Sequence, residues 1–73
     1  PPLPIISGKD LIEALAKCFG YAVARQRGSH VMVQKQAAPS STVPLHSELD
    51  RGTLRAILRQ LGITVDQLVD CLR

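Results

Sequence analysis

The strongest constraint on the fold is a pair of strand-like runs, residues 21–27 and 30–35, separated only by Gly28 and Ser29. A Gly-Ser pair between two such runs predicts a tight β-hairpin, in which Gly28 takes the positive φ of a type II′ turn. Alternation along the second strand sends Val31 and Val33 to one face of the sheet and His30, Met32 and Gln34 to the other.

A helix is predicted before the hairpin. Ser7 is a suitable N-cap, and Asp10 lies three residues later, near the positive end of the helix dipole. Gly20 is a suitable stop residue. The apolar residues between them recur at helical spacing and share one face: Leu11, Ile12, Ala14, Leu15 and Cys18.

The two cysteines, Cys18 and Cys71, are too few and too far apart in the sequence to indicate a disulfide framework or a metal site. Cys18 belongs to the apolar stripe of the first helix, so it is expected to be a small core residue rather than a reactive thiol. We therefore expect no metal and no cofactor.

Three more elements are predicted after the hairpin. A short third strand is expected at residues 42–43, which Pro44 either ends or places at a sheet edge. A second helix is expected from Arg51 to the stop residue Gly62. Residues 64–67 (Thr-Val-Asp-Gln) form a capping box that opens a short last helix. The inward faces of these two helices are expected to hold Leu54, Ile57, Leu58, Leu61, Leu68, Val69 and Leu72.

The resulting order is helix, three strands, helix and short helix. Consecutive hairpin-linked strands form a three-stranded antiparallel sheet, and the helices then gather on one of its faces, which gives an α+β two-layer domain. With 73 residues, the chain is expected to form a single domain, 1–73, in which residues 1–6 are an extended lead-in.

Positive charge is concentrated in the middle of the chain. The net charge is +3, and no acidic residue occurs between Glu13 and Glu48, a stretch that contains Lys17, Arg25, Arg27 and Lys35. A basic middle indicates a surface for a polyanion, and ordinary solubility charge is the competing interpretation. One Tyr and one Phe are too few for a platform on which single-stranded bases stack.

The hydropathy pattern argues against a membrane partner. No apolar run reaches the roughly 18 residues that a transmembrane helix needs, and no signal-peptide pattern opens the chain. A cytoplasmic location is therefore expected.

His30 is the strongest catalytic candidate, because it directly follows a two-residue turn, which holds it more firmly than a loop would. Neutral imidazole is well suited to accept a proton near pH 7. Arg25, Arg27 or Lys35 can add positive charge near it, depending on the twist of the sheet. The competing interpretation is a strand histidine that merely tolerates solvent.

Two further candidates lie after the hairpin. His46 follows Pro44 in the connection to the second helix, where it has a direct role, forms a local cap or fixes the loop through a hydrogen bond. Arg51, Arg55 and Arg59 recur every four residues along that helix. They either contact phosphates or form a solvated flank.

Five short motifs occur in order: Gly20-Tyr21, residues 25–30 (Arg-Gln-Arg-Gly-Ser-His), residues 43–46 (Val-Pro-Leu-His), residues 52–58 (Gly-Thr-Leu-Arg-Ala-Ile-Leu) and residues 61–64 (Leu-Gly-Ile-Thr). The Gly-Ser-His triplet alone is a weak signal, but the combination in this order and spacing is specific. Because of this combination, the chain resembles the HicA toxin family, the messenger-RNA interferases of toxin–antitoxin pairs. The resemblance extends from about Ile6 to Leu72.

The resemblance implies a fold similar to the double-stranded-RNA-binding domain. It also implies a ribonuclease whose active histidine, carried over onto the Gly-Ser-His triplet, is His30. The implied partner is a HicB-type antitoxin that covers the active surface. Contact with DNA is implied only through the toxin–antitoxin complex. The loop at residues 36–41 lacks the turn type common in the family, which bears on substrate preference.

Together these points predict a metal-independent endoribonuclease acting on messenger RNA. His30 would remove the proton of the ribose 2′-hydroxyl, and neighbouring cations would stabilise the charge on the phosphorane. The residues expected to bind RNA are Arg25, Arg27, Ser29, Lys35, His46, Arg51 and Arg55.

Three alternatives remain open. The first is an RNA-binding module of the same fold without chemistry, and the second is a domain that only binds a partner protein. The third is a DNA-binding helix-turn-helix over residues 54–72. It ranks lower because the last helix presents Asp66 and Asp70, which phosphates would repel.

Overall fold

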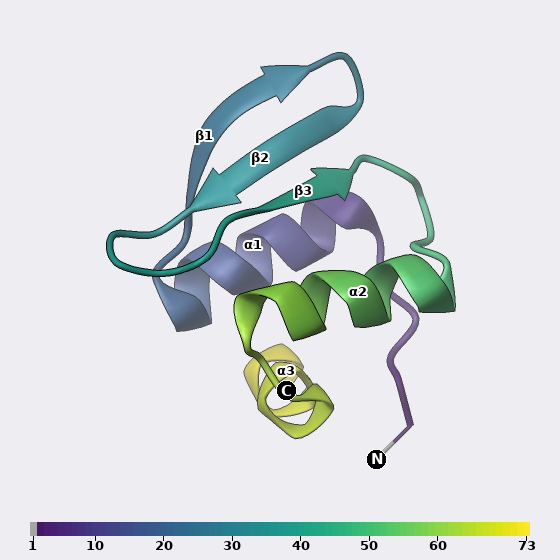
Figure 1. The fold of residues 1–73 in the computed structure, drawn as a ribbon. Coiled ribbons are helices and arrows are strands. Elements are labelled where there is room, and N and C mark those ends of the chain that lie inside the picture. Colours follow the sequence, from purple (N-terminus) through teal and green to yellow (C-terminus); the bar gives the residue numbers. More distant parts are fainter. Residues whose placement is uncertain (1) are drawn as a thin grey trace.

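The chain folds into a helix, a three-stranded sheet and two further helices, so the predicted α+β class and element order are confirmed. The computed structural model describes residues 2–73; Pro1, part of the predicted lead-in, lies outside them. The elements are α1 (Gly8–Phe19), β1 (Ala22–Arg27), β2 (His30–Gln34), β3 (Ser41–Pro44), α2 (Arg51–Leu61) and α3 (Val65–Leu72) (Figure 1).

The sheet is antiparallel, with strand order β1-β2-β3. Gly28 has a φ of 56°, in the positive range that the predicted hairpin turn requires. The register shifts between Val23 and Arg25, which identifies a β-bulge at Ala24 that the sequence pattern did not predict. Both outer strands are short, six and four residues.

The helices form a layer on one side of the sheet. α1 and α2 run beneath it, and α3 lies under them, on the side away from the strands (Figure 1). The core lies between these layers, as the alternation along β2 predicted for Val31 and Val33. The largest fully buried side chains are Leu11, Leu15, Leu54, Leu68, Val33 and Val43. No helix within residues 2–73 is long and apolar enough to cross a membrane.

The helix ends follow the capping residues. The Asp10 amide donates to Ser7 Oγ at 3.0 Å, and Thr64 and Gln67 form the predicted capping box at the start of α3. α1 and α2 end at Gly20 and Gly62, both in the left-handed conformation. Local sequence signals thus fix where each helix begins and ends.

Gly8, the first residue of α1, packs directly against the end of β3. Its amide donates to the carbonyl of His46 at 2.9 Å. A Cβ built on Gly8 would lie 2.0 Å from the Pro44 carbonyl oxygen, so no other residue fits without moving backbone. This contact joins α1 to the loop that follows β3.

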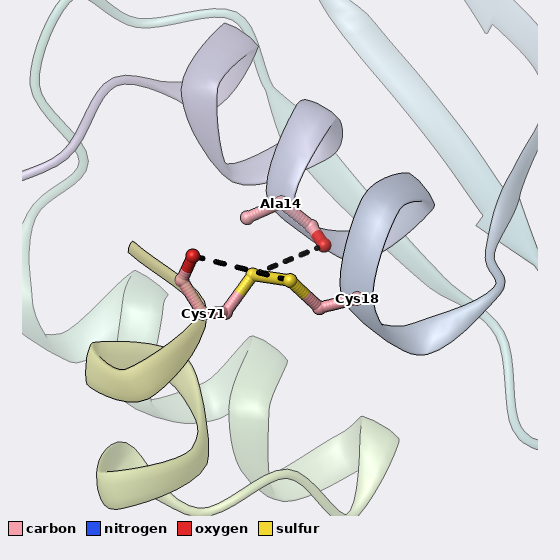
Figure 2. The surroundings of a disulfide bond; sticks show 3 residues. All are labelled: Ala14, Cys18 and Cys71. Carbon is pink, nitrogen blue, oxygen red and sulfur yellow. Dashed lines mark hydrogen bonds between the residues drawn. A yellow bond between two sulfur atoms is a disulfide. The ribbon is translucent and has the colours of Figure 1, made fainter. Parts of the chain in front are cut away.

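The cysteines depart from the prediction. Cys18 and Cys71 form a disulfide between α1 and α3 (Figure 2), and the Cys18 residue is exposed rather than part of the core. The prediction was wrong because 53 residues of sequence separation say nothing about distance once α3 packs against α1. The Cys71 sulfur also lies 3.6 Å from the Ala14 carbonyl oxygen, a contact within the same helix pair.

The inward face of α3 was also predicted incompletely. Leu68 is fully buried and Val69 is half-buried, but Leu72 is 42% exposed. Leu72 lies at the last turn of α3, beyond the reach of the core, and it borders a hollow shared with Ile5.

Candidate active site

A small hollow lies on the face of the sheet that points away from the helices. It has a volume of about 130 Å³ and is lined by Arg25, Arg27, His30, Met32 and Thr42. We refer to it as the His30 hollow. Within residues 2–73, no carboxylate lines it, so its charge is positive. Such a surface attracts a phosphate group.

The hairpin turn holds His30 at the edge of this hollow. The Gln26 side-chain amide donates to the Gly28 carbonyl at 2.9 Å. On the other side, the Leu45 amide donates to the Ser29 carbonyl at 2.7 Å. The turn is therefore tied both to its own strand and to the segment after β3, while His30 itself is exposed to solvent.

Strand register determines which cations share a face with His30. Arg27 is paired with His30, and Arg25 is paired with Met32. Side chains of paired residues leave the same face of a sheet, so both arginines project on the His30 side.

The bulge at Ala24 is what gives Arg25 this orientation. On the N-terminal side of the bulge, Val23 pairs with Val33, whose side chain points to the helices. Continued without a shift, that register would pair Arg25 with Val31 and send the guanidinium to the core face. The extra residue moves Arg25 to the face that carries His30.

Lys35 does not join this group. It follows the far end of β2, where its ammonium donates to the Phe19 carbonyl at 3.0 Å and lies 5.0 Å from the centre of the Tyr21 ring. This lysine therefore ties the C-terminus of α1 to the sheet. Ser29, by contrast, lies in the turn beside His30 and is exposed.

The candidates after β3 lie elsewhere on the surface. His46 is exposed and does not line the His30 hollow. Arg51 is exposed at the first position of α2. Arg55 lines a separate hollow between α2 and α3, together with Ile63 and Val65.

Asp50 is the N-cap of α2, and its carboxylate accepts from the Thr53 hydroxyl at 2.8 Å and from the Thr53 amide at 3.3 Å. These two hydrogen bonds lower the pKa of Asp50 below its ordinary value, and attraction to the His46 side chain adds to the effect.

Thr42 and Met32 were missed as site residues. Thr42 pairs with Met32 across β2 and β3, and Met32 pairs with Arg25, so all three leave one face. The alternation along the predicted strands carried this signal, but neither residue type suggests catalysis by itself. No group of three or more His, Cys, Asp or Glu that could hold a metal occurs in the part of the chain that the structure describes.

A comparison with protein families assigns the chain. The model of the HicA toxin of bacterial toxin–antitoxin systems matches residues 8–63, most of the chain. The chain belongs to the HicA toxin family. It is therefore the toxin of a toxin–antitoxin pair, and an antitoxin is its expected partner.

The matched region begins at Gly8 and ends at Ile63, so this HicA toxin carries α3 and Cys71 beyond the family match. The His30 hollow lies entirely within it. No curated protein and no solved structure matches the chain.

Proposed function

We propose that the toxin is an endoribonuclease that cleaves messenger RNA without a metal, with His30 as general base. The observation that carries this proposal is the placement of an exposed imidazole beside two guanidinium groups in one hollow. The family assignment supports the toxin role, and the hollow supports a phosphodiester substrate.

RNA supplies its own nucleophile, the ribose 2′-hydroxyl. In the proposed step, a ring nitrogen of His30 takes the proton from this hydroxyl as the 2′-oxygen attacks the adjacent phosphorus. The bond from phosphorus to the 5′-oxygen breaks, leaving a 2′,3′-cyclic phosphate on one fragment and a 5′-hydroxyl on the other. A positioned base contributes roughly 10²–10⁴-fold to such a step.

Arg25 and Arg27 would stabilise the negative charge that develops on the phosphoryl oxygens. Guanidinium groups suit this role because they donate two parallel hydrogen bonds to a phosphate. Both lie on β1, which pairs with the strand that begins at His30, so the hairpin places all three groups on one face.

Ser29 and Thr42 would contact RNA near the cleaved bond. His46, Arg51 and Arg55 lie outside the hollow, and we assign Arg51 and Arg55 only contacts with more distant phosphates. Of these, His46 is the remaining candidate for protonating the leaving 5′-oxygen, since it is the only other histidine.

The proposed setting is the cytoplasm, where messenger RNA is translated, and the proposed partner is a HicB-type antitoxin that covers the His30 face. Contact with DNA would occur only within the toxin–antitoxin complex. Cytoplasmic thiol reductants would keep Cys18 and Cys71 as thiols there, because disulfides rarely persist in that compartment.

The test is cleavage of a single-stranded messenger RNA by the purified toxin in EDTA. We expect fragments ending in a cyclic phosphate, and a loss of at least about 10²-fold in rate for His30→Ala. Gln34→Ala, an exposed change on the same strand, is the matched control and should retain activity. Fragments with 5′-phosphates, or full activity of His30→Ala, would refute the scheme.

Growth arrest on expression gives a second measurement. If His30→Ala arrests growth as strongly as the unchanged chain, the alternative of a non-catalytic RNA-binding module is supported instead. His46→Ala with unchanged turnover would remove that residue from the mechanism.

A further inference from the structure

A second and larger hollow adjoins the His30 hollow at the edge of the sheet. It has a volume of about 570 Å³ and lies between β3 and α2. Met32 and Thr42 line both hollows, so the two share a wall. The nucleotide next to a phosphate at His30 would therefore lie beside the larger hollow.

The chemistry of the second hollow differs from that of the first. α2 lines it with Thr53, Ala56, Ile57 and Gln60. Their spacing of three and four residues places them on one helix face. Within residues 2–73, no ionised side chain lines this hollow, and Arg55 lines a separate one. This hollow therefore offers no positive charge to pair with a phosphate.

Neutral donors and acceptors around apolar groups are what a nucleobase requires. Sequence-specific proteins read single-stranded bases through hydrogen bonds to their edges and through contact with their flat faces. Met32 and Ala56 supply apolar contact, and the hydroxyl of Thr42 supplies a hydrogen-bonding group.

The hydrogen bonds within the hollow fix the polarity of its groups. The Ser41 hydroxyl donates to Gln60 Oε1 at 2.8 Å, which leaves the Gln60 amide nitrogen as a free donor. The Thr53 hydroxyl donates to Asp50, so its oxygen can only accept from a ligand. A side chain held in one orientation discriminates better than one that can rotate.

We propose that this hollow is a base-recognition subsite for the nucleotide next to the cleaved bond, with Gln60 as its specificity-determining residue. The Gln60 amide would donate to a carbonyl oxygen or ring nitrogen of that base. The inference rests on the proposed ribonuclease function and adds a determinant of where the RNA is cut.

The experiment uses the purified toxin and a pool of single-stranded RNA oligonucleotides of random sequence, whose cleaved ends are sequenced. Gln60→Glu replaces the donor by an acceptor and keeps the Ser41 contact. Gln60→Ala removes the group at an exposed helix position that alanine suits. Gln67→Glu, in the capping box of α3, makes the same charge change away from both hollows and still accepts from the Thr64 amide.

We expect both Gln60 variants to cut RNA but to alter the base frequency at one position beside the cut by roughly threefold to tenfold, the effect of one lost or reversed hydrogen bond. Gln67→Glu should match the unchanged toxin. Identical base frequencies for all four proteins would overturn the subsite. If the unchanged toxin leaves the pool uncut, the ribonuclease function itself is refuted. This outcome is distinct from a failure of the base-recognition subsite.

Discussion

Arg27 and His30 are paired across the hairpin between β1 and β2, so the guanidinium and the imidazole leave the same face of the sheet. Only the two-residue turn at Gly28 and Ser29 separates them along the chain. The short turn, which the Leu45 amide also holds, therefore fixes the cation and the proposed base relative to each other.

This pairing predicts that Arg27→Ala lowers the cleavage rate by roughly 10²-fold, the effect of losing one preorganised donor to the transition state. Arg55→Ala removes the same charge from an exposed site outside the His30 hollow and should change the rate far less. Rates on one RNA substrate at saturating concentration make the comparison. Equal losses would mean that overall charge, rather than placement, supports cleavage.

The salt dependence of RNA binding follows from the number of phosphates contacted. If about three are neutralised, the logarithm of the association constant should fall with the logarithm of salt concentration at a slope of roughly −2. The His30→Ala variant allows binding to be measured without cleavage. A slope near zero would show that the basic hairpin does not meet RNA.

Gly8 provides a test of the contact between α1 and β3. Gly8→Ala forces a Cβ into the Pro44 carbonyl and should destabilise the fold by about 1–3 kcal/mol, as overpacking does. Gly52→Ala is the matched control in the first turn of α2, where the nearest atom to a new Cβ is 4.0 Å away. It should be neutral or slightly stabilising. Urea unfolding of both variants measures the difference, and similar stabilities would contradict the contact.

The disulfide predicts a large difference in stability between the oxidised and reduced chains. Closing a loop across 53 residues removes entropy from the unfolded chain worth about 4 kcal/mol in the chain-entropy account. Reduction should therefore lower the urea midpoint, and a double variant, Cys18→Ala with Cys71→Ala, should no longer respond to reductant. RNA cleavage should respond little, since neither sulfur lies near His30. Equal stability of the oxidised and reduced chains would contradict a stabilising role for the disulfide.

Asp50 predicts an acid-dependent loss of stability. Its pKa is lowered in the folded chain, so its ionised form stabilises the fold above the ordinary carboxyl range, about pH 4. That contribution disappears as the pH falls through the folded pKa. Asp50→Asn keeps a capping side chain but cannot titrate. Its melting temperature should depend less on pH between 6 and 3 than that of the unchanged chain, and parallel curves would argue against the assigned hydrogen bonds.

Most of the fold could be predicted from local signals. The Gly-Ser turn fixed the hairpin, and Ser7, Thr64, Gly20 and Gly62 fixed the helix ends, because turns and caps depend on residues close in sequence. The α+β order follows from them without any knowledge of tertiary contacts.

The features that the sequence did not predict depend on tertiary packing. The disulfide between Cys18 and Cys71 needs α3 to lie against α1, which no local pattern reveals. The bulge at Ala24 was equally hidden, so the sequence could not decide which cations face His30. Lys35 is a predicted RNA contact, but the Phe19 carbonyl holds its ammonium at the far end of the sheet.

The position of the sulfur pair has a practical consequence. Cys18 and Cys71 are the only cysteines, and they join α1 to α3 on the helical side of the molecule (Figures 1 and 2). His30 projects from the opposite face of the sheet. After reduction, a reagent that bridges the two sulfurs would attach a fluorophore or a surface linker at one defined position. The toxin could then be tethered to a slide with its nucleic-acid face open, so that individual encounters with a transcript can be watched.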